Sequence, residues 1–113
     1  MGGAYAKGYA QALMDYILMY PNLFNGVSIV EYDFAPYQPE SQSAVNGVDT
    51  FQYSHHYDKV AKDSPIKGAH YHTSYDENKG HSISSFYSYI NQLPEGKYKV
   101  IDGQIVKIQW RHY

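Results

Sequence analysis

The segment Gly26-Val27-Ser28-Ile29-Val30-Glu31-Tyr32-Asp33 says most about the fold, because it is an extended stretch with apolar side chains on both faces. Alternate side chains of a strand point to opposite faces, so Val27 and Ile29 lie on one face, and Val30 and Tyr32 lie on the other. A strand that is apolar on both sides is covered on both sides. The segment therefore predicts a sheet with other structure packed on at least part of each face.

Helical spacing marks two other segments. From Ala4 to Tyr20, bulky residues recur every three or four positions, which is the period of one helix face, and Pro21 stops the helix. The predicted buried face consists of Tyr5, Tyr9, Leu13, Tyr16, Ile17 and Tyr20, with the polar residues Lys7, Gln11 and Asp15 between them. The same spacing returns from Ser82 to Leu93, where Ser82 is available as an N-cap.

Further strands are predicted at Val48 to Tyr53, Lys67 to Thr73, Lys97 to Ile101 and Gln104 to Trp110. Asp102-Gly103, between the last two, is the strongest short-range hairpin signal in the chain. Strands and helices do not alternate regularly, which favours an α+β fold. We expect one domain over residues 1–113, with a single mixed or mainly antiparallel sheet packed by an N-terminal helix and a second helix, and a C-terminal β-hairpin.

Charge and composition narrow the classes of function. The chain has 9 Lys and Arg against 11 Asp and Glu, a net charge of −2, so no nucleic-acid partner is expected. The lack of cysteine excludes disulfides, thiolate catalysis and Cys-ligated zinc. Asp15 interrupts the apolar segment near the N-terminus, so neither a signal peptide nor a membrane span is expected. Compartment and oligomeric state are left open, as is membership of a longer polypeptide.

Tyrosine is unusually abundant, with 14 copies along the chain. Its ring has a polar tip, so this abundance serves either a core of half-buried rings or a recognition surface. Because a small core needs bulky residues and the tyrosines recur at structural periods, we expect most of them in the core. The alternative is a Tyr-rich protein-binding or accessory module of a larger polypeptide, with a protein as substrate or partner.

The segment Gly68-Ala69-His70-Tyr71-His72-Thr73 carries the most chemically suggestive pattern. Two histidines separated by one residue project from the same strand face, so their imidazoles can converge on one metal ion. A catalytic zinc site needs about three protein ligands and a water. His70 and His72 would supply two ligands, and the third would be Asp76, His81 or one of the His55-His56 pair. The predicted cofactor is therefore Zn²⁺.

A metal-bound water also needs a proton acceptor. Glu31 is the candidate, because it shares a strand face with apolar side chains, an environment that favours uptake of a proton by a carboxylate. Ser82, Ser84 and Ser85 stand where a helix begins and could donate to a developing oxyanion. Glu31 and Ser84 are accordingly the predicted catalytic residues.

In order along the chain, Glu31, His70-Tyr71-His72-Thr73 and Ser82 to Ser85 resemble the JAMM/MPN-type (JAB-like) zinc isopeptidases, including the JAB-like domains of bacterial Rhs-type polypeptides. The resemblance spans about residues 26 to 110. It implies a layered sheet, zinc held by His70, His72 and an acidic residue, and Glu31 as general acid/base. The family pattern places Pro where Thr73 stands and Asp after the Ser, whereas Ser82 to Leu93 contains no Asp or Glu, so the resemblance extends equally to a degenerate, non-catalytic relative.

Metal-free chemistry is a second alternative. Two of His56, His70, His72 and His81 would act as a proton donor and a proton acceptor, as in small RNA-cleaving toxins, because the ordinary histidine pKa of about 6.5 suits both roles. The charge of −2 and the lack of a Lys/Arg cluster disfavour RNA as the substrate.

Overall fold

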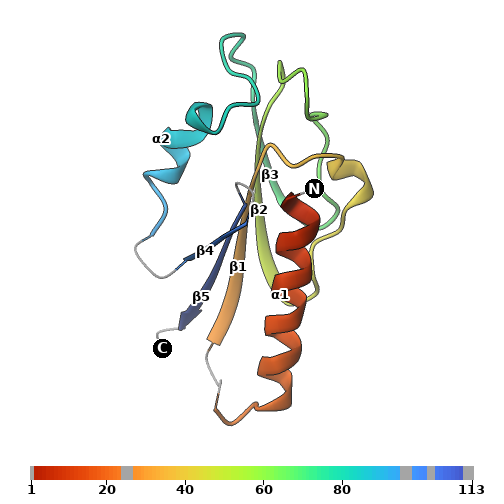
Figure 1. Ribbon diagram of the computed structural model, residues 1–113, viewed down its shortest axis with the longest axis vertical. Helices are drawn as coiled ribbons and strands as arrows, with labels where there is room; N and C mark the ends of the chain where they lie inside the picture. The colour runs from red at the N-terminus through yellow and green to blue at the C-terminus, as the bar shows by residue number, and fades with distance from the viewer. Residues whose placement is uncertain (1, 24–26, 95–97, 102–103, 111–113) are drawn as a thin grey trace.

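The computed structural model describes residues 2–23, 27–94, 98–101 and 104–110, and side chains for part of these. In chain order the elements are helix α1 (Gly2–Met19), strand β1 (Val27–Phe34), the 3₁₀ turn η1 (Pro39–Ser41), strands β2 (Val48–His55) and β3 (His70–Ser74), the 3₁₀ turn η2 (Ile83–Phe86), helix α2 (Tyr87–Ile90), and strands β4 (Tyr98–Ile101) and β5 (Gln104–Trp110). Figure 1 shows α1 on one side of the sheet and α2 on the other.

The strands form one five-stranded sheet in the order β3-β2-β1-β5-β4. β1, β2 and β3 are parallel to one another, whereas β5 is antiparallel to both β1 and β4. The predicted α+β class and mixed sheet are confirmed, and the mainly antiparallel alternative is wrong. β4 and β5 pair as the predicted hairpin requires, with Ile101 opposite Gln104, while the turn Asp102-Gly103 lies outside the described residues.

Helix α1 covers one face of the sheet, here called the α1 face. Ala10 is fully buried in one cluster with Ile29, Val48 and Val106, and Leu13, Met14 and Ile17 pack partly buried against it. The predicted helix face is therefore confirmed at Leu13 and Ile17 and wrong at Tyr9, Tyr16 and Tyr20, which are exposed. Lys7 is buried where a solvated residue was expected, because its amino group bonds to two carboxylates of β1.

The opposite face of the sheet, here called the aromatic face, is covered by the segment that contains η2 and α2. Val30, Phe34 and the fully buried Phe86 form its core. The predicted helix from Ser82 to Leu93 is shortened to a 3₁₀ turn and a single helical turn. Ser82 makes no capping bond, and its hydroxyl instead contacts that of Ser84 at 2.8 Å.

Neighbouring strands align their rings in two rows across the aromatic face. The first row is Tyr32, Phe51 and His70, and the second is Phe34, Tyr53 and His72. Ring centroids along the first row are 5.5 and 4.8 Å apart, and along the second 5.3 and 6.1 Å. Cross-strand aromatic pairs of this kind are a main source of stability in a sheet.

The expectation that tyrosine builds the core is wrong for most of the tyrosines whose side chains are described. Tyr32 is buried, but Tyr16, Tyr75 and Tyr87 are each more than half exposed, and most of the others are exposed as well. The tyrosines that contribute to the core, Tyr32 and in part Tyr53, lie mainly on strands, where side chains of bulky residues stand perpendicular to the sheet. Tyr89 of α2 also packs partly buried against this core, whereas the other described tyrosines of helices and loops lie on the surface.

Candidate functional site

The strongest candidate site is a pair formed by Asp58 and His81. Nδ1 of His81 donates to Oδ2 of Asp58 over 2.9 Å. The Asp58 side chain is 2% exposed, while that of His81 is 42% exposed. A buried carboxylate thus holds Nδ1 of an imidazole that is partly exposed to solvent, which is the arrangement that orients a catalytic histidine.

Local backbone contacts fix the carboxylate of Asp58. Its Oδ1 accepts hydrogen bonds from the amides of Val60 and Ala61, at 2.8 and 3.0 Å. These two bonds leave Oδ2 directed at His81, so Nδ1 of His81 carries the proton and Nε2 keeps a free lone pair. This tautomer is the one a general base requires.

The pair sits at one end of the parallel part of the sheet. Asp58 follows the carboxyl end of β2, and His81 lies in the connection that follows β3. Figure 1 shows the loops that follow β2 and β3 at the upper end of the molecule. Binding and catalytic groups in sheets with parallel strands gather beyond the carboxyl ends of those strands.

A second histidine–carboxylate pair lies nearby in the sequence but differs in its partners. Nδ1 of His56 is 3.0 Å from Oδ2 of Asp63, and the hydroxyl of Tyr71 donates to the other oxygen of Asp63. Burial would raise the pKa of Asp63, but the hydrogen bonds from Tyr71 and His56 outweigh it and lower that pKa. Burial and the bond to Asp63 raise the pKa of Tyr71 to about 12. This network ties the β2–β3 connection to β3.

His55 is a buried histidine that contacts the segment following His81. Its ring is 2% exposed and stacks on Phe86 at 4.1 Å. Nδ1 lies 2.5 Å from the hydroxyl of Ser74, and Nε2 lies 3.2 Å from the carbonyl oxygen of Ser85, so Nε2 carries the proton of the neutral ring. Because Ser85 follows His81 by four residues, His55 anchors the connection that carries His81 onto the sheet.

This anchor should make stability depend on pH. Burial lowers the pKa of His55 below its ordinary value of 6.5. The folded state then binds fewer protons than the unfolded state, so the contribution of His55 is complete above pH 6.5 and is lost as the pH falls toward the lower folded-state pKa. Urea unfolding between pH 7.5 and 5.5 should show a loss of stability in the wild type that His55→Gln lacks; equal slopes in the two proteins would contradict this reading.

His70 and His72 lie on the same face of β3, as the His-x-His spacing predicts, but they face aromatic rings. His70 stacks on Phe51, and His72 packs against Tyr53 and Tyr89, with Nε2 of His72 3.3 Å from the Tyr89 hydroxyl. His81 is bonded to Asp58 instead. These three predicted ligands are therefore engaged in separate contacts.

Glu31 lies on the other side of the sheet from His70 and His72. Its Oε2 accepts from Nζ of Lys7 at 2.6 Å, on the α1 face, and Asp33 accepts from the same nitrogen at 2.8 Å. Both carboxylates are fully buried. Burial, together with hydrogen bonding to Glu31 and its charge, raises the pKa of Asp33 well above its ordinary value of 3.8, although Lys7 opposes this. Glu31 thus belongs to a buried ion cluster and not to a site around His70.

Asp76 and Ser84, the two remaining predicted site residues, each contact a residue two positions away in the sequence. Oδ1 of Asp76 accepts from the amide of Asn78 at 2.9 Å, and Ser84 contacts Ser82 on the surface. Among the residues that the structure describes, no three His, Cys, Asp or Glu side chains are grouped so that they could hold a metal ion. Zinc binding stays a prediction, without an assembled ligand set in the described part of the chain.

The sequence does not single out Asp58, and it presents His81 only as a metal ligand or as one of several interchangeable proton carriers. One signal points to the pair: both residues follow strands in polar connections. That signal carries weight only if the two strands are known to be parallel, since parallel strands end at the same edge of the sheet.

No protein family, no curated protein and no solved structure matches this chain. The resemblance to JAB-like domains is therefore neither supported nor refuted and stays a prediction. In the described part of the chain, no helix combines the length and the apolar character needed to cross a bilayer.

Proposed function

We propose that the chain carries the acid/base pair of a metal-free hydrolase acting on an uncharged acyl substrate such as an ester. The observation that carries this proposal is the 2.9 Å bond between the exposed imidazole of His81 and the buried carboxylate of Asp58. The proposal keeps the histidine acid/base chemistry considered above. It replaces RNA, which a chain of net charge −2 attracts poorly, with a neutral substrate.

In this mechanism Nε2 of His81 takes the proton of an attacking oxygen as that oxygen bonds to the carbonyl carbon. The resulting imidazolium is stabilised by the Asp58 carboxylate at Nδ1. Collapse of the tetrahedral intermediate breaks the bond to the leaving oxygen, which receives the proton from Nε2. With water as the attacking group, ester and water yield acid and alcohol, and His81 returns to its starting state.

Among the described residues no hydroxyl is hydrogen-bonded to Nε2 of His81, so a water molecule is the attacking group in this mechanism.

Release of p-nitrophenolate from p-nitrophenyl acetate at pH 7.5 tests the proposal. Wild-type protein should accelerate release beyond an equal concentration of free imidazole, and His81→Ala should abolish that excess. His56→Ala is the matched control, because His56 is also bonded to an aspartate through Nδ1 and its side chain is 47% exposed, against 42% for His81.

The control separates catalysis from simple reaction of an exposed imidazole with the ester. His56→Ala should keep the wild-type excess. An equal loss in both variants would assign the activity to exposed histidines in general, and an unchanged rate in His81→Ala would remove His81 from the mechanism. Circular dichroism of each variant establishes that it is folded.

A further inference from the structure

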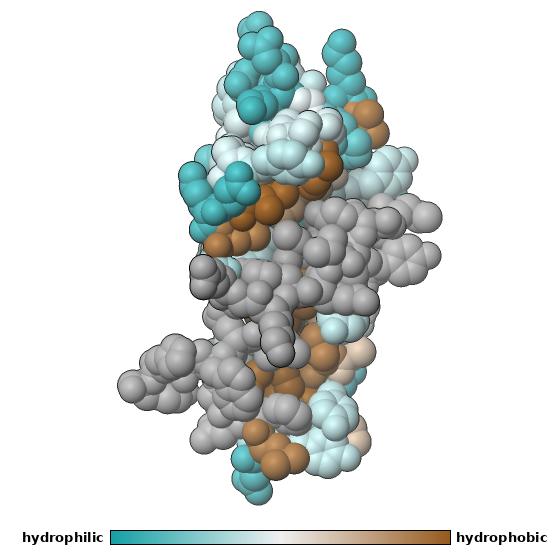
Figure 2. Space-filling view, turned by 60° about the vertical axis from the view of Figure 1, so that its left-hand side comes forward, coloured by the Kyte–Doolittle hydropathy of each residue, from teal (hydrophilic) through white to brown (hydrophobic). Residues whose placement is uncertain are grey.

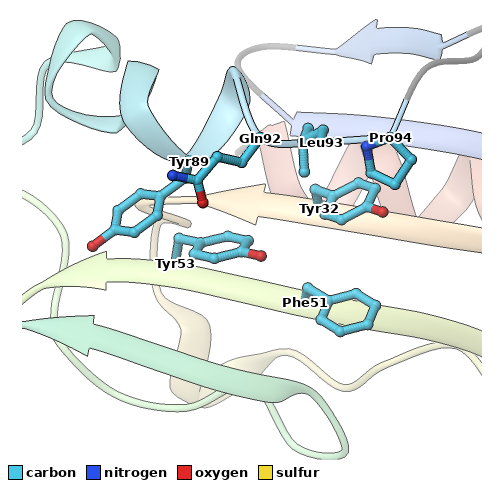
Figure 3. A pocket seen from close by; sticks show the side chains of 7 residues that line it. All are labelled: Tyr32, Phe51, Tyr53, Tyr89, Gln92, Leu93 and Pro94. Atoms are coloured by element: carbon cyan, nitrogen blue, oxygen red, sulfur yellow. The ribbon is translucent and has the colours of Figure 1, made fainter.

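A pocket opens on the aromatic face, between the sheet and the segment that follows η2. Its volume is about 280 Å³. Its lining consists of Tyr32, Phe51 and Tyr53 from the strands, and Tyr89, Gln92, Leu93 and Pro94 from the helical segment and the turn after it. Figure 3 shows the two groups of side chains facing one another, and Figure 2 shows apolar surface below the hydrophilic loops on this side of the molecule.

The lining is aromatic and carries no charged side chain. The rings of Tyr53 and Tyr89 are stacked at 5.0 Å, and those of Tyr32 and Phe51 at 5.5 Å. A tyrosine hydroxyl is uncharged at neutral pH, and burial raises the pKa of Tyr53 further above its ordinary value of 10. An ionised ligand group would lose its hydration here without gaining a charged partner, which favours a neutral ligand.

Polar groups in the lining are few. The amide of Gln92 is exposed to solvent at the pocket and can both donate and accept. A sugar ring offers a hydroxyl at nearly every carbon and needs a partner for each. This lining suits a ligand with one polar substituent, and its volume, just below the range of about 300–1,000 Å³ for ligand pockets, suits a single ring.

We propose that this pocket binds a neutral, single-ring aromatic group with one hydrogen-bonding substituent, as in a phenol. The rings of the lining can make stacked or edge-to-face contacts with a further aromatic ring. An alkyl group of equal area lacks this attraction. Gln92 hydrogen-bonds the substituent. The proposal does not depend on the Asp58–His81 pair, which lies outside the lining.

Titration with p-cresol, followed by ¹H–¹⁵N NMR, tests the site. Amide shifts should be largest for residues of the lining, with a Kd on the order of 1 mM for so small a ligand. The saturated analogue 4-methylcyclohexanol, of similar size, should bind about two- to tenfold more weakly. Equal binding of the two compounds, or tighter binding of methyl glucoside, would overturn the assignment to an aromatic ring.

Adjacent amides supply a matched pair of variants. Gln92→Ala should weaken p-cresol binding about two- to tenfold, whereas Asn91→Ala, also exposed but outside the lining, should leave it unchanged. Equal affinity in both variants would overturn the role of Gln92. Asp58→Asn should bind p-cresol like the wild type, so failure of the hydrolase proposal and failure of the pocket proposal give different results.

Discussion

Replacing Lys7 with Met is expected to lower the free energy of unfolding by about 3–5 kcal/mol. The amino group of Lys7 bonds to Oε2 of Glu31 at 2.6 Å and to Oδ2 of Asp33 at 2.8 Å, and both carboxylates have no exposed surface. Methionine matches the length of the lysine stem but leaves two buried carboxyl groups without a cation. The cost is that of uncompensated buried charge, which exceeds the value of the ion pair itself.

Urea unfolding monitored by circular dichroism at pH 7 measures this loss. Gln11→Met is the control on the same helix: Gln11 is exposed and its amide donates to Asp15 on the helix surface, so its replacement should change stability by about 0.5 kcal/mol or less.

The pH dependence of the loss tests its cause. Burial and Glu31 raise the pKa of Asp33, and Lys7→Met removes the cation that opposes this, so the folded variant binds protons more readily than the unfolded chain and gains stability as the pH falls. The difference from wild type should shrink between pH 7 and about pH 4, near the ordinary carboxyl pKa. A difference that is constant over this range would assign the loss to packing and not to charge.

The pattern that could be predicted is local. Both faces of β1 are apolar at a period of two, and the structure places Ile29 under α1 and Val30 under η2 and α2, as that period requires. The hairpin strands around Asp102-Gly103 were predicted because a two-residue turn signal and its flanking strands are contiguous in the sequence.

What could not be predicted is contact between distant residues. Lys7 is spaced like a solvated helix residue, and only carboxylates 24 and 26 positions away make its burial favourable. The direction of β2 is a similar case. Asn46-Gly47 is a dipeptide typical of hairpins, which join antiparallel strands, yet β2 runs parallel to β1. The connection that contains η1 returns the chain to the end of the sheet at which β1 begins.

The Asp58–His81 contact could not be predicted from the sequence for the same reason. Asp58 and His81 are separated by 23 positions and meet only because β2 and β3 are parallel. His70 and His72 have the spacing of one strand face, and on that face they contact the rings of Phe51, Tyr53 and Tyr89, with no third ligand grouped beside them among the described residues.

Replacing Asp58 with Asn is expected to lower the rate of ester hydrolysis by about 10²- to 10⁴-fold. Asparagine keeps the volume of the side chain and can still accept the amide bonds from Val60 and Ala61 through its carbonyl oxygen. Its NH₂ group then faces Nδ1 of His81 and donates to it, so the ring proton moves to Nε2. His81 loses the lone pair that takes the proton from the attacking oxygen, and no carboxylate remains to stabilise the imidazolium.

The pre-steady-state and steady-state rates of p-nitrophenolate release are measured for Asp58→Asn, for the wild type and for Asp63→Asn. The Asp63 variant makes the same chemical change beside His56 and should keep the wild-type rate, because His56 has no part in the mechanism. A fall in Asp58→Asn that matches the fall in His81→Ala would show that the two side chains act as one unit, since removing either member of such a unit removes most of its effect. If Asp58→Asn retains the wild-type rate while His81→Ala does not, the bond between the two residues positions the loop only, and His81 acts without an orienting carboxylate.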